Sequence, residues 1–336
     1  MKKIIVWLCA VLLIAGSLAG CGTAPAHSGD KLRIVATVYP AYDWVREVLG
    51  EEAQNAEITL LADNGVDLHS FQPTAQDMIS IASCNMFLYV GGESDEWVED
   101  ALEDAANPNM SVIKLFGALG NAVKKEEIVE GMQVEKDNDD DDDDGIFDDD
   151  FFEKDEEDED ESDEHVWLSL RNAQIFVDAI AATLGKIDPE KSEAYRQNAD
   201  AYNKKLAELD LRYQQMVGAA EQHTLLFADR FPFRYLVDDY DLSYYAAFVG
   251  CSAESEASFE TVTFLAKKVD ELGLKSVMVV ENSDRKIADT VISATKTRDQ
   301  SILELNSLQS VTDKNGADTY LSVMEKNLSV LEAALK

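Results

Sequence analysis

The sequence predicts an α/β protein with two lobes. Each lobe is a mostly parallel sheet flanked by helices, and a long rigid linker helix joins the lobes, with the ligand cleft between them. Two observations carry this prediction. Short β-branched apolar segments alternate with segments of helical periodicity in both halves of the chain. Between the halves, residues 190–217 place apolar or aromatic residues at helical spacing over 28 residues, which corresponds to about 40 Å of helix.

The N-terminus predicts export. Residues 1–20 are typical of a signal peptide, because Lys2 and Lys3 precede an apolar run too short for a membrane span. The "LAGC" ending at Cys21 resembles the lipobox of bacterial lipoproteins, which implies cleavage before Cys21 and lipidation of its thiol. Residues 21–30 then form a tether. We expect a protein anchored by lipid at the extracytoplasmic face of a bacterial membrane; the alternative is an ordinary secretory signal with a chance cysteine.

The first predicted lobe spans residues 31–188. Pro40 ends its first strand, and Thr74 is a candidate N-cap. The spacing predicts strands over 31–39, 56–63, 85–92 and 111–117, and helices over 41–50, 74–84, 95–105 and 165–187.

The linker helix is predicted over 189–217, with Pro189 in its first turn, where proline is tolerated. The second lobe, 218–336, repeats the alternation. Strands are predicted over 223–229, 243–250, 275–282 and 301–306, and helices over 231–241, 258–273, 285–296 and 318–335.

The charge is strongly acidic and unevenly distributed. The chain has a formal net charge of -37, and residues 135–164 hold 21 Asp and Glu against two Lys. Such a segment cannot bury apolar surface, so we expect a disordered acidic insert. It is either a solvated loop or an antenna that raises the cation concentration near His165. Nucleic acid is excluded as a partner because phosphate binding requires clustered Lys and Arg.

One loop carries a specific resemblance. Residues 64–77, "NGVDLHSFQPTAQD", lie between a predicted strand and helix, where cleft ligands are expected. The loop resembles the first metal-ligand motif of the zinc/manganese-type substrate-binding lipoproteins of ABC importers. The matching residues are Asp67, His69, Phe71, Pro73 and Thr74. The resemblance extends over nearly all of the mature chain and implies that His69 is a metal ligand.

Three further segments support this resemblance. "DEHVWLSL" is similar to the second family motif, which implies that His165 is the second ligand. Residues 250–258 resemble a loop of the family, with Ala253 and Ala257 in the places of two prolines of the family pattern. The long helix resembles the family's helical connector. Two neutral imidazoles suit Zn²⁺, and they accept Mn²⁺ when carboxylates complete the coordination sphere.

Two expected ligand positions are altered. The third-ligand slot holds Arg230, which is permanently charged and cannot bind a cation. The fourth, after the last strand, offers only the neutral oxygens of Asn306 and Gln309. Three explanations stay open. A shifted carboxylate, Asp229 or Glu281, completes the site; or Arg230 is a structural or anion-binding group that pairs with Glu256 or another acid; or the site has drifted and binds metal weakly.

The resemblance implies a monomeric receptor that captures a divalent metal, Zn²⁺ first and Mn²⁺ next, and delivers it to an ABC permease with its ATPase. An adhesin with a degenerate metal site is one alternative. A zinc hydrolase is another, disfavoured because the sequence contains no "HExxH" and no recognisable nucleophile motif; we therefore predict no enzyme.

Two histidines and two cysteines are left without a part in the predicted site. His27 and His223 are expected to be structural or exposed. Cys84 lies in an apolar segment, which favours a buried small hydrophobe. Export permits a disulfide between Cys84 and Cys251, but their spacing does not establish one.

Overall fold

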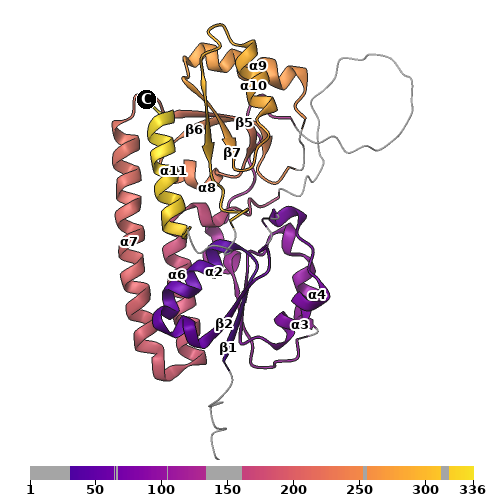
Figure 1. The fold of residues 1–336 in the computed structure, drawn as a ribbon, viewed down its shortest axis with the longest axis vertical. Coiled ribbons are helices and arrows are strands. Elements are labelled where there is room, and N and C mark those ends of the chain that lie inside the picture. Colours follow the sequence, from indigo (N-terminus) through magenta and orange to yellow (C-terminus); the bar gives the residue numbers. More distant parts are fainter. Residues whose placement is uncertain are drawn as a thin grey trace, which may run out of the picture. The chain divides into compact units, whose positions relative to one another are not determined.

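The computed structural model describes residues 31–63, 65, 67–103, 105–133, 161–252, 256–311 and 318–336. Within them, two four-stranded sheets are each accompanied by helices (Figure 1). The predicted two-lobe α/β class is therefore confirmed. Arg33–Lys336 form one compact unit, so the lobe boundaries at residues 188 and 217 stay predictions.

The first sheet has the strand order β2-β1-β3-β4. Its strands are β1 (Leu32–Ala36), β2 (Ala56–Leu60), β3 (Met86–Tyr89) and β4 (Ser111–Lys114). Pairing is parallel from β1 to β3, with Val35 opposite Phe87, and from β3 to β4, with Phe87 opposite Val112. Val35 and Phe87 are buried in one cluster with Ile81 and Val98 of the covering helices. This burial accounts for the apolar strand sequences.

Five helices belong to this lobe. They are α2 (Tyr39–Leu49), α3 (Ala75–Ser83), α4 (Trp97–Glu103), α5 (Leu115–Leu119) and α6 (Leu170–Ile187). Single turns of 3₁₀-helix lie at Gly50–Asn55, Leu68–Ser70, Glu93–Asp95, Gly120–Ala122, Val166–Leu168 and Pro189–Lys191. The turn Leu68–Ser70 contains His69, and the turn Val166–Leu168 directly follows His165, the two predicted histidine ligands.

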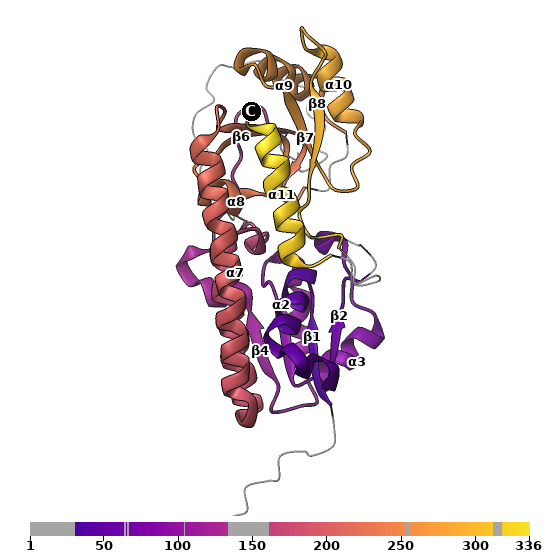
Figure 2. The same cartoon turned by 60° about the vertical axis from the view of Figure 1, so that its left-hand side comes forward.

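The long helix α7 (Ser192–Ala219) contacts elements of both lobes. Near its start, Asn198 Nδ2 donates to Val48 O of α2 over 2.9 Å. Near its end, Tyr213 Oη donates to Met324 O of α11 over 2.6 Å, and the Tyr213 ring stacks on Tyr240. Figure 2 shows α7 and α11 side by side. The helix therefore fixes both lobes to one rigid element.

The second sheet has the order β6-β5-β7-β8, and all its pairs are parallel. Its strands are β5 (Thr224–Phe231), β6 (Ser243–Val249), β7 (Ser276–Val280) and β8 (Ser301–Leu305). Its helices are α8 (Arg234–Asp239), α9 (Phe259–Leu272), α10 (Lys286–Ala294) and α11 (Tyr320–Ala334). The register of β5 against β6 shifts between Phe227 and Arg230, and such a bulge redirects the side chains that follow it.

Several predicted elements have different bounds in the structure, and three of them lie next to the predicted site or change type at one end. The segment 111–117 leaves the sheet after Lys114 and continues as α5. The segment 165–187 begins as a 3₁₀ turn, and α6 starts only at Leu170 because Ser169 caps it. Phe231 still belongs to β5, so α8 starts at Arg234.

The predicted acidic insert ends earlier than expected. Residues 135–160 lie outside the described residues, as do the signal peptide, Cys21, the tether and His27. Part of 161–164, which the sequence assigns to the disordered insert, is instead packed: Ser162 bridges Lys125, and Asp163 and Glu164 are buried, whereas Glu161 is exposed. Their burial follows from hydrogen bonds to the site described below.

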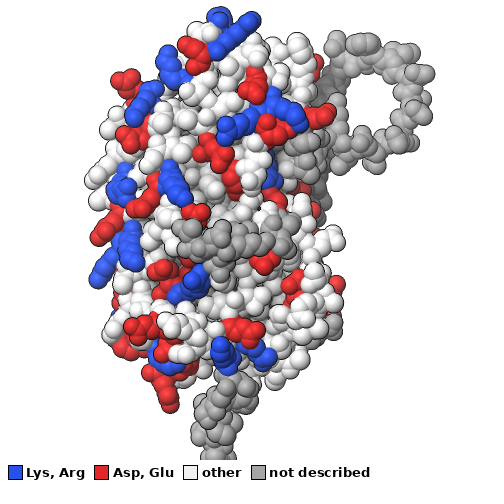
Figure 3. Space-filling model, in the orientation of Figure 1, with Lys and Arg blue, Asp and Glu red and all other residues white. Residues whose placement is uncertain are grey.

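Figure 3 shows Lys and Arg interspersed with Asp and Glu over one face of the molecule. On that face, the described side chains form no continuous basic surface. Among the same residues, no helix combines the length and the apolar character needed to cross a bilayer.

Candidate metal site

His69 is held by the turn that contains it. Asp67 caps the 3₁₀ turn Leu68–Ser70, and its Oδ1 accepts a hydrogen bond from His69 N over 3.0 Å. Five residues later, Thr74 and Asp77 form a capping box at the start of α3. The "DLHSFQPT" segment therefore encodes two successive caps, with the half-buried histidine on the turn between them.

His165 is held by the residue two positions before it. Asp163 Oδ1 accepts from His165 N over 2.8 Å and lies 3.1 Å from His165 Nδ1. The imidazole is fully buried and packs edge-on against Trp167. Trp167 Nε1 in turn donates to Ser307 O, after β8, over 2.8 Å. This contact places His165 against the second lobe.

The two rings face each other through their Nε2 atoms, which lie 3.4 Å apart. Two nitrogens bound to one tetrahedral Zn²⁺ at about 2.0–2.1 Å also lie about 3.4 Å apart. Behind the rings, His69 Nδ1 lies 2.8 Å from Ser94 Oγ and 3.3 Å from Glu164 Oε2, while His165 Nδ1 faces Asp163. A carboxylate at Nδ1 favours the tautomer that directs the lone pair of Nε2 toward a metal.

Electrostatics keep His69 in its metal-binding form. Burial, together with the nearby His165, lowers the pKa of His69 to about 3 against the opposing effect of Asp67. The ring is therefore neutral at pH 7. Burial raises the pKa of Glu164, although a hydrogen bond from Ser94 N, 2.8 Å from Glu164 Oε1, opposes this shift.

Arg230 forms an ion pair with Asp67. Its Nη2 also lies 3.4 Å from Gln309 Oε1. Burial alone would raise the pKa of Asp67, but Arg230 and His69 lower it, and the net shift is downward. The acid that pairs with Arg230 is thus Asp67. Glu256, the acid named from the sequence, forms no ion pair with Arg230 among the contacts of the described residues.

The lower-ranked ligand candidates have other partners. Asp229 accepts from the backbone amides of Arg230 and Val280. Glu281 accepts from the amide and the hydroxyl of Ser307, each over 2.7 Å. Neither carboxylate joins the histidine pair in the group of metal-ligating atoms described below.

Gln309 does reach the histidine pair. Its terminal amide contacts His165 Nε2, and with the amide rotated, its nitrogen donates to Asp67 Oδ1 over 3.2 Å. The same rotation directs the amide oxygen toward His165 Nε2. Of the three lower-ranked candidates, Gln309 is the one that the structure brings to the histidines.

Sequence reasoning missed Cys251. One ligand atom each from His69, His165 and Cys251 lies within 4.8 Å of the others. Among the described residues, these three form the group of His, Cys, Asp and Glu side chains that lie close enough together to hold a metal ion. A signal for it exists in the sequence, because Cys251 directly follows the strand 243–250, whose carboxyl end faces the cleft. Both Cys84 and Cys251 are free thiols, so they do not form a disulfide. Cys84 is buried, with its Sγ 3.4 Å from Met110 Sδ.

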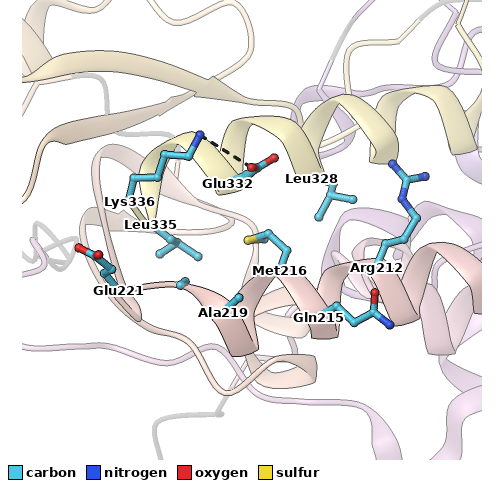
Figure 4. A pocket seen from close by; sticks show the side chains of 10 residues that line it. Arg212, Gln215, Met216, Ala219, Glu221, Leu328, Glu332, Leu335 and Lys336 are labelled. Atoms are coloured by element: carbon cyan, nitrogen blue, oxygen red, sulfur yellow. Dashed lines mark ion pairs between the residues drawn. The ribbon is translucent and has the colours of Figure 1, made fainter.

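A separate cavity of about 670 Å³ lies between the end of α7 and α11 (Figure 4). Its walls include Met216, Leu328 and Leu335 together with the ion pair of Glu332 and Lys336. None of the predicted site residues lines it. His223, just before β5, is exposed and does not belong to the histidine pair.

The fold and this site define a class of two-lobed α/β binding proteins with a paired-histidine centre. The chain belongs to the family described as zinc-uptake complex component A, periplasmic, which residues 34–334 match. It is 29% identical to the zinc-binding lipoprotein AdcA of Streptococcus pneumoniae over 99% of this chain and 61% of that protein. It thus spans less than two thirds of the length of that relative.

Two further comparisons cover more of the relative. The chain is 28% identical to the high-affinity zinc uptake system protein ZnuA of Bacillus subtilis, over 95% of this chain and 93% of that protein. The Zn(II)-bound ZnuA-like domain of pneumococcal AdcA matches the structure with a TM-score of 0.67 and 27% identity, over 91% and 99% of the two chains. A laminin-binding protein of Streptococcus agalactiae, at 22% identity and a TM-score of 0.68, shows the fold alone.

Proposed function

We propose that this chain is an extracytoplasmic solute-binding lipoprotein that captures Zn²⁺ between its lobes and delivers it to an ABC permease and its ATPase. The observation that carries the proposal is the 3.4 Å separation of the two Nε2 atoms. Each ring has an oxygen partner behind it, so the lone pairs of the two nitrogens converge on one point. A divalent cation at that point relieves their repulsion.

The ligand set proposed here is His69, His165 and the amide oxygen of Gln309. The names of the pneumococcal and B. subtilis relatives, which refer to zinc binding and zinc uptake, support Zn²⁺ as the cargo. Nitrogen donors favour Zn²⁺ over Mn²⁺, because Mn²⁺ prefers carboxylate and carbonyl oxygens. Mn²⁺ is the alternative cargo, and competition between the two ions separates them.

Metal analysis of the protein purified without chelator tests the proposal. We expect one equivalent of Zn²⁺ per chain, and we expect His69→Ala and His165→Ala each to abolish tight binding. His223→Ala is the matched control, because His223 is exposed and not part of the pair. Full affinity in either site variant would contradict the site assignment.

Thermal unfolding provides a second readout. A ligand that binds only the folded state at 100 times its dissociation constant stabilises it by about 2.7 kcal/mol. Zinc should therefore raise the melting temperature of the wild type and of His223→Ala, but not that of His165→Ala. Absence of metal-dependent stabilisation in the wild type would favour the adhesin alternative, and turnover of an ester or peptide substrate would favour the hydrolase.

The membrane anchor and the transport partners are tested in cells. The lipobox-like "LAGC" supports lipidation at Cys21. We expect Cys21→Ala to release the protein from the membrane and to lower zinc uptake when zinc is scarce. Membrane retention of Cys21→Ala would argue against the lipid anchor.

A further inference from the structure

The site lacks an obvious third strong ligand. The slot in which the resemblance implies one holds Arg230, whose guanidinium is paired with Asp67. Asp229 and Glu281 are occupied by backbone amides and by Ser307. Two imidazoles and a neutral amide oxygen are a weak set for a structure that the family associates with zinc uptake. A further ligand is therefore needed near the two Nε2 atoms.

The loop after β6 brings the thiol of Cys251 close to the histidine pair. Gly250 packs directly on His165: a Cβ atom added at Gly250 would lie 3.2 Å from His165 Cε1 and 2.9 Å from Phe231 O. The glycine thus permits the approach of the loop that carries the next residue, Cys251. Glu126 Oε1 holds that loop by accepting from Cys251 N over 2.9 Å.

We propose, building on the zinc-binding function above, that Cys251 is the third metal ligand and replaces the residue lost at the Arg230 slot. The ligand atoms of His69, His165 and Cys251 lie within 4.8 Å of one another. Sulfur at about 2.3 Å and nitrogen at about 2.0–2.1 Å from one tetrahedral Zn²⁺ lie about 3.6 Å apart, so a shift of about 1 Å closes the set.

The chemistry of this step is balanced. The Cys251 S–H bond breaks, a sulfur–zinc bond forms with the thiolate electron pair, and the proton leaves to solvent. The charge of the bound ion is reduced from +2 to +1 by the thiolate, and the buried Asp163 and Glu164 behind the histidines offset the remainder. A neutral oxygen donor such as Gln309 then suffices for the fourth position.

A thiolate also determines which metal is bound. Soft sulfur ligands favour Zn²⁺, whereas Mn²⁺ prefers hard oxygen ligands. The proposal therefore assigns the metal selectivity of this chain to Cys251. Replacing the thiolate by a carboxylate in Cys251→Asp should move the preference toward Mn²⁺, while Cys251→Ser should weaken Zn²⁺ binding more than Mn²⁺ binding.

Cobalt substitution tests the proposal directly. The full-length chain, purified in detergent, is titrated with Co²⁺ and its absorption spectrum is recorded. We expect a thiolate-to-cobalt charge-transfer band in the near ultraviolet that saturates at one equivalent. Cys251→Ser should lose the band and bind Zn²⁺ more than about 100-fold more weakly, since even residues behind the ligands cost 10–100-fold. Cys84→Ser is the matched control and should keep both.

The outcomes separate this inference from the proposed function. One equivalent of Co²⁺ that requires both histidines but gives no charge-transfer band would overturn the assignment of Cys251 and leave the zinc-binding function standing. Wild-type zinc affinity in Cys251→Ser would overturn it as well. Failure of the wild type to bind either ion would overturn both proposals.

Discussion

At the scale of single residues, the polar contacts behind the histidines hold the rings in place. Glu164 Oε2 lies 3.3 Å from His69 Nδ1, and the other oxygen of this carboxylate accepts from Ser94 N. We expect Glu164→Gln to weaken zinc binding by about 10- to 100-fold, because the carboxylate orients the ring and makes it a better donor. Calorimetric titration measures the affinity. Glu52→Gln, at an exposed ion pair with Lys191, is the control; equal affinity in both variants would contradict this role of Glu164.

The buried imidazole of His69 predicts a pH dependence of stability. Its pKa in the folded protein is about 3, below the ordinary 6.5. Between these values the unfolded chain binds the proton and the folded protein does not, so stability falls as the pH drops from 6.5 toward 3. One proton corresponds to about 1.4 kcal/mol per pH unit. Urea unfolding with chelator present gives the unfolding free energy at each pH. Between pH 3 and 6.5, the slope of this free energy against pH should be shallower in His69→Gln than in the wild type, by up to this amount. Identical slopes in the two proteins would refute the prediction.

Residues differ in how far the sequence could assign them. His69 and His165 stand in local motifs, so their positions could be predicted. The partner of Arg230 depends on which loops meet across the cleft, and the sequence could say only that it is an acid; the structure shows Asp67. Cys251 was missed because it is 182 and 86 residues from the two histidines, and only the order of strands in the sheets brings the three together.

At the scale of elements, the N-cap of α6 joins the two lobes four residues after His165. Ser169 Oγ accepts from Asn172 N over 3.0 Å and donates to Asp239 over 2.6 Å. Burial raises the pKa of Asp239, so this carboxyl depends on that partner. We expect Ser169→Ala to cost about 2 kcal/mol of unfolding free energy, the upper end for a cap.

Ser258→Ala is the comparison within the same chain. Ser258 caps α9 by accepting from Thr261 N over 3.1 Å, but it is only half-buried and holds no buried carboxyl. Its loss should cost about 1 kcal/mol. Urea unfolding of both variants measures the difference, and an equal cost would show that the Ser169–Asp239 contact adds nothing.

Periodicity could predict which elements exist, but not where they change type. The segment 111–117 is apolar apart from Ser111 and Lys114, and its strand-to-helix transition at Leu115 has no clear signal in the pattern. The register shift in β5 is invisible as well, because it arises from the pairing of β5 with β6. That shift directly precedes Arg230, the residue in the altered ligand slot.

At the scale of the whole molecule, two helices contact both lobes. Besides α7, the last helix α11 does so: Tyr320 N donates to Asp43 Oδ2 over 2.9 Å, and Tyr320 Oη donates to Trp167 O over 2.7 Å. Trp167 packs on His165. A helix near the C-terminus therefore supports the residue that packs on His165, a proposed ligand, and local sequence patterns cannot predict this contact.

We predict that the acidic insert has a long-range electrostatic effect. Residues 135–164 carry 21 acidic side chains against two Lys and end directly before His165. A field of this sign raises the local concentration of divalent cations and speeds their capture, whereas the stability of the bound ion depends on the ligands.

We therefore expect replacement of the Asp and Glu of residues 137–160 by Asn and Gln to leave the zinc dissociation constant unchanged. It should lower zinc uptake by cells when zinc is scarce, and the difference should shrink in high salt, because salt screens the field. Deletion of 137–160 controls for length and should act in the same way. Unchanged uptake at every zinc concentration in both variants would leave the insert without this role.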